Sequence, residues 1–227
     1  QKAGTPGLID SRPVGTGPFS FKEYRHNEYV RYLRHPGYWG GEAKIEQLIY
    51  DITPKSSKRL AKLLTGECDV MSTPAASQLS VIDQDPDLSL AVQSGMNVAF
   101  LALNTRKAPF NKVQVRQAIA SAINIDNLLQ AVYFETGQPA NSLLPPLSWG
   151  YNPSLPMRQP DLKRARQLLK EAGLEQGFEM QVLVQPGSRA YNPDALKTAQ
   201  LMRSDLAKVG IKLKIVQQEW PVIEARL

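Results

Sequence analysis

The second half of the chain alternates between helix and strand patterns, and this alternation constrains the fold more than any other feature. The segment DLKRARQLLKEAG has the periodicity of an amphipathic helix, with Asp161 as its N-cap and Gly173 just past its end. Three further segments complete the pattern: the strand FEMQVLV, the long helix DALKTAQLMRSDLAKVG and the alternating strand IKLKIVQ. Strands that alternate with helices in this way indicate an α/β fold.

The first hundred residues show a different pattern, in which strands predominate. The expected strands are residues 19–24, 28–35, 45–53, 68–72, 88–93 and 97–104. The segment SSKRLAKLLTGE predicts a helix with Ser56 or Ser57 as its cap and Gly66 just past its end, and AASQLSVIDQ predicts a second, short helix. Strands and helices mixed in this order favour a mixed sheet that is covered by helices.

A polar segment that contains proline, NTRKAPFNK, separates the two patterns, and we place a domain boundary near residues 95–105. After it, VQVRQAIASAIN predicts a helix and IDNLLQAVY predicts a second one. The apolar face of the first of these helices is expected to hold Val113, Val115, Ile119 and Ile123. Residues 137–160 are rich in Pro, Ser, Asn and Gly, and they predict a long loop that Trp149 and Tyr151 anchor.

The composition is that of an ordinary globular protein, with 227 residues of which 42% are hydrophobic and 21% are charged. No run of 18 apolar residues occurs, so no segment is expected to span a membrane. The first ten residues contain neither an initiator Met nor the apolar centre of a signal peptide, and the final QQEWPVIEARL predicts a strand end followed by the first turns of a helix. We therefore expect the sequence to be a piece of a longer protein.

The net charge of +6 comes from the second half of the chain. Residues 1–102 carry 11 Lys and Arg against 11 Asp and Glu, whereas residues 103–227 carry 16 against 10. A basic half is compatible with nucleic acid, an anionic membrane or acidic ligands as partners. However, the basic residues stand singly beside acidic ones, as in DLKRARQLLKEAG, without the dense runs of a nucleic-acid surface. A solvated helix face accounts for them.

Gly15 and Gly17 in RPVGTGPFSF raise the question whether the chain has a phosphate-binding loop. Such a loop needs a preceding strand, a following helix and usually a lysine. Here Pro18 follows at once, no Lys-Ser or Lys-Thr pair is present, and the next residues alternate in polarity as those of a strand do. The sequence therefore predicts a tight bend that leads into a strand, with glycine used for its backbone freedom.

Residue types that carry out catalysis or bind metals are scarce. The only histidines are His26 and His35, and neither has a His or Cys neighbour at ligand spacing. No GxSxG or HExxH motif occurs. Cys68 is the only cysteine, which excludes a thiolate metal cluster and an internal disulfide. We expect no enzymatic activity, no catalytic residues, no metal site and no cofactor.

Five segments resemble corresponding segments of one protein family, in the same order. They are PVGTGPF, GYWGG, GECDVM, NVAFLALNTRKAPFNKVQVRQAIASAIN and DALKTAQLMRSDLAKVGIKLKI. Together they resemble the large solute-binding proteins of bacterial ABC importers for peptides, of the oligopeptide and dipeptide type. The segments LLTGECDV, PAASQL, GMNVAFLALNT and EARL look most like the Sap-type branch, which is linked to the handling of antimicrobial peptides.

The resemblance implies a two-lobed periplasmic binding protein fold, class II-like, whose lobes are joined by two crossing segments and close on a peptide. Residues 1–95 would be the later part of lobe one, 96–105 a crossing segment and 106–227 most of lobe two. The implied function is to capture peptides outside the cytoplasm and deliver them to an ABC permease and its ATPase in the inner membrane. The implied protein is a periplasmic monomer that binds no nucleic acid. The alternatives are a haem or metal-chelate binder of the same family and a basic nucleic-acid-binding domain.

The resemblance also implies two ligand-binding residues. In dipeptide binders an Arg before a YNP sequence pairs with the C-terminal carboxylate of the peptide, and SRAYNP places Arg189 there. Family members have a Trp after a Glu that lines the ligand cavity, and QEWP places Trp220 there. The aspartate that binds the amino group of the peptide lies in a motif beyond residue 227. Cys68 stands where dipeptide-type members have a cysteine bonded to another near their N-terminus, and that partner is not in this sequence.

Overall fold

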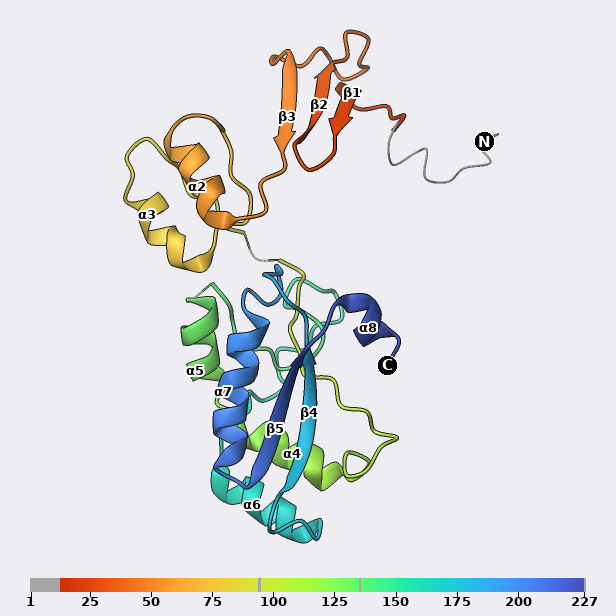
Figure 1. The fold of residues 1–227 in the computed structure, drawn as a ribbon, viewed down its shortest axis with the longest axis vertical. Helices are drawn as coiled ribbons and strands as arrows, with labels where there is room; N and C mark the ends of the chain where they lie inside the picture. The colour runs from red at the N-terminus through yellow and green to blue at the C-terminus, as the bar shows by residue number, and fades with distance from the viewer. Residues whose placement is uncertain (1–12, 94, 135, 227) are drawn as a thin grey trace, which may run out of the picture. The chain divides into compact units, whose positions relative to one another are not determined.

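The structure is a computed structural model that describes residues 13–93, 95–134 and 136–226 (Figure 1). It divides the chain into two compact units, residues 1–74 and residues 75–227. The division of the chain into lobes at residues 95–105 stays a prediction. No helix in the described ranges is both long enough and apolar enough to cross a membrane.

The first unit contains an antiparallel sheet in the order β1 (Phe19–Arg25), β2 (Tyr29–Arg34) and β3 (Gln47–Asp51). Three of the expected strands are therefore confirmed. The expectation of a mixed sheet is wrong, because each strand follows its neighbour through a hairpin connection. Asn27 makes the first of these turns with a left-handed φ of 61°.

The bend before β1 also matches its prediction in part. Residues 17 and 18 form a bend and β1 begins at Phe19, so a strand and not a helix follows the two glycines. Neither Gly15 nor Gly17 has a left-handed φ, however. The backbone freedom of glycine is therefore not used at this bend.

Three expected strands do not form in the part of the chain that the structure describes. They are residues 68–72, 88–93 and 97–104. A strand needs hydrogen-bond partners along at least one edge, and no described residue pairs with these segments. Val70, Val92 and Phe100 in these segments are largely exposed, whereas Leu101 and Leu103 pack against the core of the second unit. The apolar pattern alone was therefore not enough to predict a paired strand.

Helix α2 (Ser56–Leu64) follows the sheet in the first unit. Its N-cap is Lys55, without a side-chain hydrogen bond, so the prediction of Ser56 or Ser57 as the cap is wrong. Arg59, within the helix, donates from its guanidinium to the carbonyl oxygens of residues 53 and 54 at 3.0 and 2.8 Å. The predicted end is confirmed, because Gly66 lies just past the helix with a φ of +73°.

The second unit is mainly helical around one parallel strand pair. Its elements are η1 (Ala76–Gln78), α3 (Leu79–Asp83), α4 (Val113–Ala122), α5 (Ile125–Leu128), the π-helical turn η2 (Leu129–Tyr133), α6 (Leu162–Glu171), β4 (Phe178–Val184), α7 (Ala195–Ala207), β5 (Ile211–Gln217) and α8 (Trp220–Glu224). Every predicted helix of this half is confirmed, as are both strands. Asp161 caps α6 by accepting from the backbone N–H of Arg164 at 2.8 Å, as predicted.

The core of the second unit lies between the helices and one face of the β4–β5 pair. Helix α4 contributes a stripe of four residues to it: Val115, Ala118, Ile119 and Ala122. Val113 is exposed, and its assignment to this face is wrong. Since successive residues of a helix are 100° apart, residues 115, 118, 119 and 122 share one side and residue 113 does not. Helices α6 and α7 and alternate residues of both strands complete the core.

Asp205 is a charged residue inside this core, with 4% of its surface exposed. Its Oδ2 atom accepts a hydrogen bond from the backbone N–H of Asn124 at 2.9 Å, and its Oδ1 atom accepts one from Lys208 Nζ at 2.7 Å. Asn124 is the N-cap of α5. Asp205 therefore fastens α7 to the corner between α4 and α5.

The long loop before α6 is not anchored as expected. Trp149 is fully exposed and Tyr151 is only half-buried, so the anchoring role assigned to this pair is wrong for Trp149. The loop is instead tied by the side-chain amide of Asn141, which donates to the carbonyl oxygens of Asn152 and Leu155 at 3.3 and 3.2 Å. A polar group, not an aromatic ring, closes this loop.

Candidate functional site

The parallel pairing of β4 and β5 brings two loops to the same edge of the sheet. The strands pair in register from Phe178 opposite Ile211 to Val184 opposite Gln217. The chain therefore leaves both strands at the same level, and Gln218 N continues the pairing by donating to the carbonyl oxygen of Val184 at 3.0 Å. In α/β sheets this carboxyl-end edge is where ligands bind.

Arg189 lies in the loop that follows β4, and its backbone is fixed. Its N–H donates to the carbonyl oxygen of Asn192 at 3.0 Å, and Asn192 N–H donates back to the carbonyl oxygen of Arg189 at 3.1 Å. Gly187, with a φ of +80°, allows the chain to turn before this pair. The Arg189 side chain is exposed, and among the described residues its one hydrogen bond joins Nε to Gln185 Oε1 at 3.5 Å. Its planar donor fork is therefore available to a ligand.

Two tyrosines fasten the same loop to the rest of the unit. The hydroxyl of Tyr133, in the π-helical turn η2, donates to the carbonyl oxygen of Tyr191 at 2.8 Å. The hydroxyl of Tyr191 donates to Gln185 Oε1 at 3.2 Å. Burial raises the pKa of the Tyr133 phenol, so this hydroxyl keeps its proton at neutral pH. The loop that carries Arg189 is held in place at two points.

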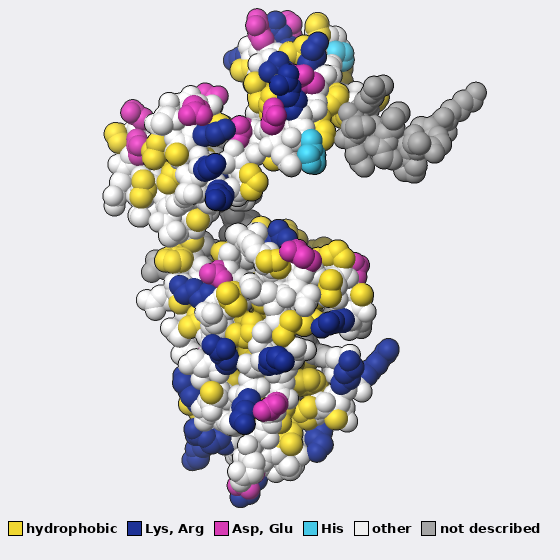
Figure 2. All heavy atoms as spheres, in the orientation of Figure 1, with side chains coloured by type: hydrophobic (Ala, Val, Ile, Leu, Met, Phe, Trp, Pro, Cys, Tyr) yellow, Lys and Arg dark blue, Asp and Glu magenta, His cyan; other side chains and the backbone are white. Residues whose placement is uncertain are grey.

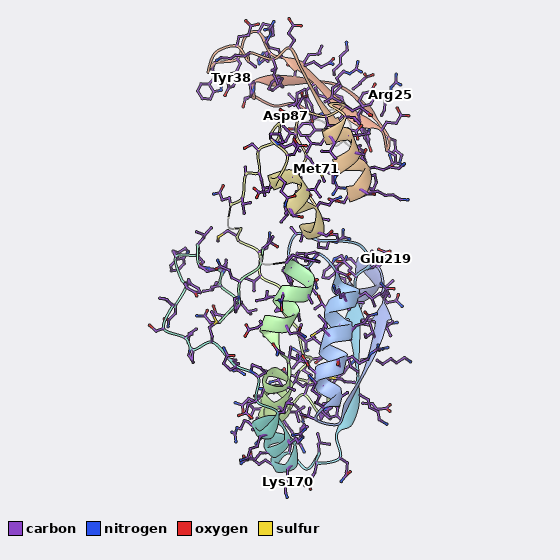
Figure 3. All side chains as sticks on the ribbon, turned by 90° about the vertical axis from the view of Figure 1, so that its left-hand side faces the viewer. Arg25, Tyr38, Met71, Asp87, Lys170 and Glu219 are labelled. Carbon is purple, nitrogen blue, oxygen red and sulfur yellow. The ribbon has the colours of Figure 1, made fainter. Side chains whose placement is uncertain are left out.

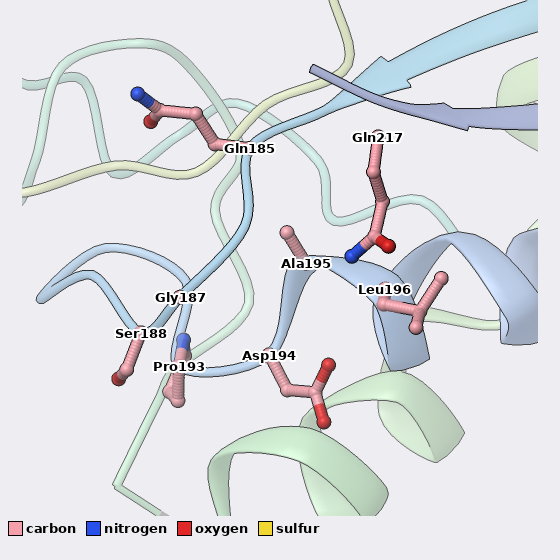
Figure 4. A pocket seen from close by; sticks show the side chains of 8 residues that line it. All are labelled: Gln185, Gly187, Ser188, Pro193, Asp194, Ala195, Leu196 and Gln217. Carbon is pink, nitrogen blue, oxygen red and sulfur yellow. The ribbon is translucent and has the colours of Figure 1, made fainter. Parts of the chain in front are cut away.

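A pocket of about 250 Å³ opens at this edge of the sheet (Figure 4). Its lining comes from the two strand ends, the Arg189 loop and the start of α7: Gln185, Gly187, Ser188, Pro193, Asp194, Ala195, Leu196 and Gln217. Asp194 caps α7, its Oδ1 atom accepting from the N–H of Lys197 at 2.8 Å. The cap places a negative charge at the helix N-terminus, which makes this spot unfavourable for an anion. A ligand carboxylate would therefore bind more favourably to Arg189 than to the N-terminus of α7.

Trp220 is the first residue of α8 and is 47% exposed. It follows β5 as Arg189 follows β4, so both residues lie in segments that leave the sheet at the same edge. Within the described ranges no contact joins the two side chains, and neither of them lines the pocket itself. Their role as ligand-binding residues stays a prediction.

Sequence reasoning did not name the polar residues that line the pocket. Gln185 directly follows β4, and Gln217 is the last residue of β5. Ser188 precedes Arg189, and Asp194 caps α7. One sequence signal was available, because VLVQ and KIVQ both place a glutamine after a run of apolar strand residues. Only the knowledge that these strands are parallel neighbours would have joined the two glutamines.

The residues weighed for metal binding or catalysis do not gather at this site. No group of three or more His, Cys, Asp or Glu that could hold a metal is found within residues 13–93, 95–134 and 136–226. His26 lies in the first unit, with its Nδ1 atom 3.1 Å from the hydroxyl of Tyr24. Cys68 is a half-buried free thiol in the same unit.

Several basic residues of the second unit have a structural use at helix ends. Lys112 Nζ donates to the carbonyl oxygen of Ala172, the C-cap of α6, at 2.7 Å. Arg166 donates to the carbonyl oxygen of Lys208, the C-cap of α7, at 2.8 Å. Positive charge is favourable at these helix ends. In the face that Figure 2 shows, Lys and Arg are scattered singly over this unit.

A second pocket, of about 500 Å³, lies at the other end of the unit and includes Arg166, Lys170 and Lys208. Lys170, near the end of α6, and Glu219, just before α8, are labelled at opposite ends of this unit in Figure 3. Lys170 pairs with Glu175 at 3.4 Å, and Arg166 bonds the end of α7. All three of these basic side chains already have partners, since Lys208 pairs with Asp205, which makes this pocket a weaker candidate than the first.

Comparison with known proteins places these features in one family. A model of bacterial extracellular solute-binding proteins, family 5, middle part, matches residues 1–226. The chain is 44% identical over 220 residues to the peptide transport periplasmic protein SapA of Salmonella typhimurium, covering 97% of this chain and 40% of that protein. It is 42% identical over 219 residues to heme-binding protein A of Haemophilus influenzae, covering 96% of this chain and 40% of that protein.

A solved structure is similar over almost the whole chain. It is a dipeptide-binding protein from Pseudoalteromonas sp. SM9913 in complex with Met-Leu, with 45% identity and a TM-score of 0.81, covering 95% of this chain and 42% of that one. The chain thus spans about two fifths of the length of its relatives. The structural neighbours are two-lobed periplasmic binding proteins, so the α/β fold class and the family resemblance expected from the sequence are confirmed.

Proposed function

The chain belongs to the family 5 extracellular solute-binding proteins of bacteria, and we propose that it is the middle part of a peptide-binding component of an ABC import system. The whole protein would be close in length to its relatives, of which this chain spans about 40%. It would capture peptides in the periplasm, antimicrobial peptides among them, and deliver them to a membrane permease and its ATPase. It would act as a monomer without enzymatic activity or a cofactor.

One observation carries the proposal. Arg189 is exposed and Trp220 is half-exposed. Both lie in segments that leave the sheet at its carboxyl-end edge, beside a pocket. The chain that carries them is 45% identical to a protein solved with Met-Leu. A peptide presents a carboxylate and varied side chains, and these are the groups that an arginine fork and a tryptophan ring bind.

In this proposal Arg189 binds the C-terminal carboxylate of the peptide. The guanidinium can donate two parallel hydrogen bonds to the two carboxylate oxygens, which a lysine cannot do. The Asn192 backbone pair and the tyrosine bonds position the loop in advance, so less conformational entropy is lost on binding. Trp220 packs on a peptide side chain, and residues 96–105 form a crossing segment between residues 1–95 and residues 106–227.

The test uses the whole protein, titrated by calorimetry with Met-Leu and with Met-Leu amide, which lacks the carboxylate. A hydrogen bond to a charged group contributes about 1.5–3 kcal/mol, so Arg189→Ala should weaken Met-Leu binding by roughly 10- to 150-fold. The amide should bind the unchanged protein about as weakly as Met-Leu binds the variant. In Arg189→Ala the acid and the amide should bind alike, which closes a double-mutant cycle on this contact.

Arg203→Ala is the matched control, because it removes the same charge from an exposed position on α7. It should leave the affinity for Met-Leu unchanged within about twofold. If the amide and the acid bind equally to the unchanged protein, Arg189 does not bind the carboxylate. If no di- or tripeptide binds, peptide capture itself is wrong.

The 227-residue chain alone should bind Met-Leu more weakly than about 1 mM. A single arginine contact that is open to water contributes about 1 kcal/mol, whereas association costs at least several kcal/mol. Micromolar binding by the 227-residue chain would mean that these residues hold a complete site.

A second candidate function is haem binding, favoured by the similarity to heme-binding protein A. The second unit contains no His or Cys in residues 75–227, so an axial ligand from this unit would have to be of another type. Absorbance titration of the whole protein with haem distinguishes the two functions. A saturable Soret shift that Met-Leu does not compete with would favour haem.

A further inference from the structure

The pocket at the carboxyl-end edge of the β4–β5 pair has the size of one side chain and not of a whole peptide. Its volume is about 250 Å³, whereas pockets for drug-sized ligands span roughly 300–1,000 Å³. Gly187 and Ser188 form part of its wall, so the pocket begins directly before Arg189 in the chain. The Arg189 loop thus combines an exposed guanidinium with a hollow of side-chain size.

The wall of this pocket combines polar and apolar groups. Ser188 contributes a hydroxyl, and Gln217, at the end of β5, contributes an amide. Pro193, Ala195 and Leu196 contribute apolar surface. Figure 4 shows the Gln217 side chain extending from β5 towards Leu196 at the start of α7. A lining of this kind suits a side chain with an apolar stem and a polar end.

Among the eight described residues that line the pocket, Asp194 alone is charged. Its carboxylate is held in position, because Oδ1 accepts from the backbone N–H of Lys197 at 2.8 Å. Within residues 13–93, 95–134 and 136–226, no donor contacts the other oxygen, Oδ2. A carboxylate that is fixed in this way and keeps one oxygen open attracts a cation and repels an anion.

The basic side chains of the neighbouring segments do not neutralise Asp194. Lys197 Nζ donates to the carbonyl oxygen of Ala131 at 2.7 Å and lies 5.7 Å from the centroid of the Phe134 ring. Arg189 Nε contacts the glutamine that follows β4, at 3.5 Å. The positive end of the α7 dipole, equivalent to about half a charge, offsets only part of the carboxylate charge. The pocket therefore keeps a negative potential.

We propose that this pocket receives the side chain of the C-terminal residue of a peptide and that Asp194 selects a cationic one, lysine or arginine. This selectivity rests on the peptide capture inferred under Proposed function. The carboxylate and the side chain of a C-terminal residue leave the same Cα atom, so a carboxylate on Arg189 directs the side chain towards Ser188 and the pocket. The apolar stem of the side chain packs on Leu196, and its cationic end lies beside Asp194.

The test titrates the whole protein by calorimetry with Met-Lys, Met-Gln and Met-Glu. Asp194 is exposed, and an ion pair open to water changes an affinity by about fivefold at most. Attraction of lysine and repulsion of glutamate together should make Met-Lys bind about tenfold more tightly than Met-Glu. Met-Gln, which has the shape of Met-Glu without its charge, should lie between them. Raising the ionic strength from about 0.01 M to about 1 M should reduce the ratio, because the Debye length falls from about 30 Å to about 3 Å.

Asp194→Asn tests the role of the charge without removing the cap of α7, because asparagine caps helices about as well as aspartate. The ratio of the Met-Lys and Met-Glu affinities should fall to about twofold or less. Asp194→Ser, which also keeps a capping oxygen, is the second variant in case the first does not fold. Asp161→Asn is the matched control, because Asp161 caps α6 through the same bond at 2.8 Å and does not line the pocket. It should leave the ratio unchanged within about twofold.

Two results would overturn the selection by Asp194. One is equal binding of Met-Lys and Met-Glu to the unchanged protein, and the other is a preference for Met-Lys that survives Asp194→Asn or is lost equally in Asp161→Asn. If Met-Leu binds through Arg189 but these results are found, only the charge selection is wrong. If none of the dipeptides binds, peptide capture is wrong as well.

Discussion

Asp205 provides a quantitative test of how the second unit is held together. Its buried carboxylate accepts from the backbone N–H of Asn124 and from Lys208 Nζ. A hydrogen bond to a charged group contributes about 1.5–3 kcal/mol, and the half-exposed Lys208 adds about 0.5 kcal/mol. We therefore expect Asp205→Ala to lower the free energy of unfolding by about 2–3.5 kcal/mol.

Two matched variants separate the contributions. Asp205→Asn keeps an oxygen that can accept from Asn124 N–H but loses the charge, so we expect a loss of about 1 kcal/mol. Lys208→Met removes only the exposed partner and should lower the free energy of unfolding by about 0.5 kcal/mol or less. Urea unfolding followed by circular dichroism at 222 nm measures all three, because helices α4 to α7 of the second unit dominate this signal.

Two results would contradict this anchoring role of Asp205. If Asp205→Ala is no more destabilising than Lys208→Met, the Asn124 N–H does not depend on the carboxylate. Hydrogen exchange at Asn124 gives an independent reading, since losing its acceptor should expose this amide before the rest of α5. Unchanged exchange at Asn124 in Asp205→Ala would refute the assignment of the anchor.

Further predictions concern two glycines and one ion pair. A Cβ atom on Gly177, which has a φ of +78°, would stand 1.9 Å from the carbonyl oxygen of Gly210. Gly177→Ala should therefore cost clearly more than the about 1–2 kcal/mol expected for Gly173→Ala, where φ is +73° and no atom lies within 4 Å; equal melting temperatures of the two variants would contradict this. Hydrogen bonds from Lys62 and then Thr53 lower the pKa of Asp51 from its ordinary value of 3.8, so this pair stabilises the fold fully above that value and less as pH falls below it. NMR titration should show this lowered pKa, and Lys62→Met should raise it towards 3.8; an unchanged pKa would argue against the ion pair.

Features that depend on neighbouring residues in the sequence were predictable from it. The Asp161 cap involves only residues within one helical turn, and Gly66 and Gly173 end their helices for a local steric reason. The N-cap of α2 was not predictable from the two serines, since the helix already begins at Ser56 and its N-cap is Lys55, which makes no side-chain cap hydrogen bond. Local sequence signals therefore predicted the cap of α6 and the end of α2, but not the first residue of α2.

Features that depend on distant partners were not predictable. The segment 97–104 has a strand pattern, yet no described residue pairs with it. For the candidate site, the sequence named Arg189 and Trp220 through family resemblance alone. That they lie at one edge follows from the parallel pairing of β4 and β5, which a sequence pattern does not specify.

The two strand systems also differ in when they can form during synthesis. A short turn at Asn27 joins β1 to β2, and hairpins of this kind close within about 1–10 μs. Strands β4 and β5 pair only after the whole of α7 has been made, because residues 185–210 lie between them. The β1–β2 hairpin can therefore form on the ribosome before β4 and β5 pair, with Tyr24 44% exposed. Uncovered strands of this kind are prone to pair with other chains. Within the described part of the chain, this hairpin is therefore exposed to pairing with other chains while the second unit is still being made.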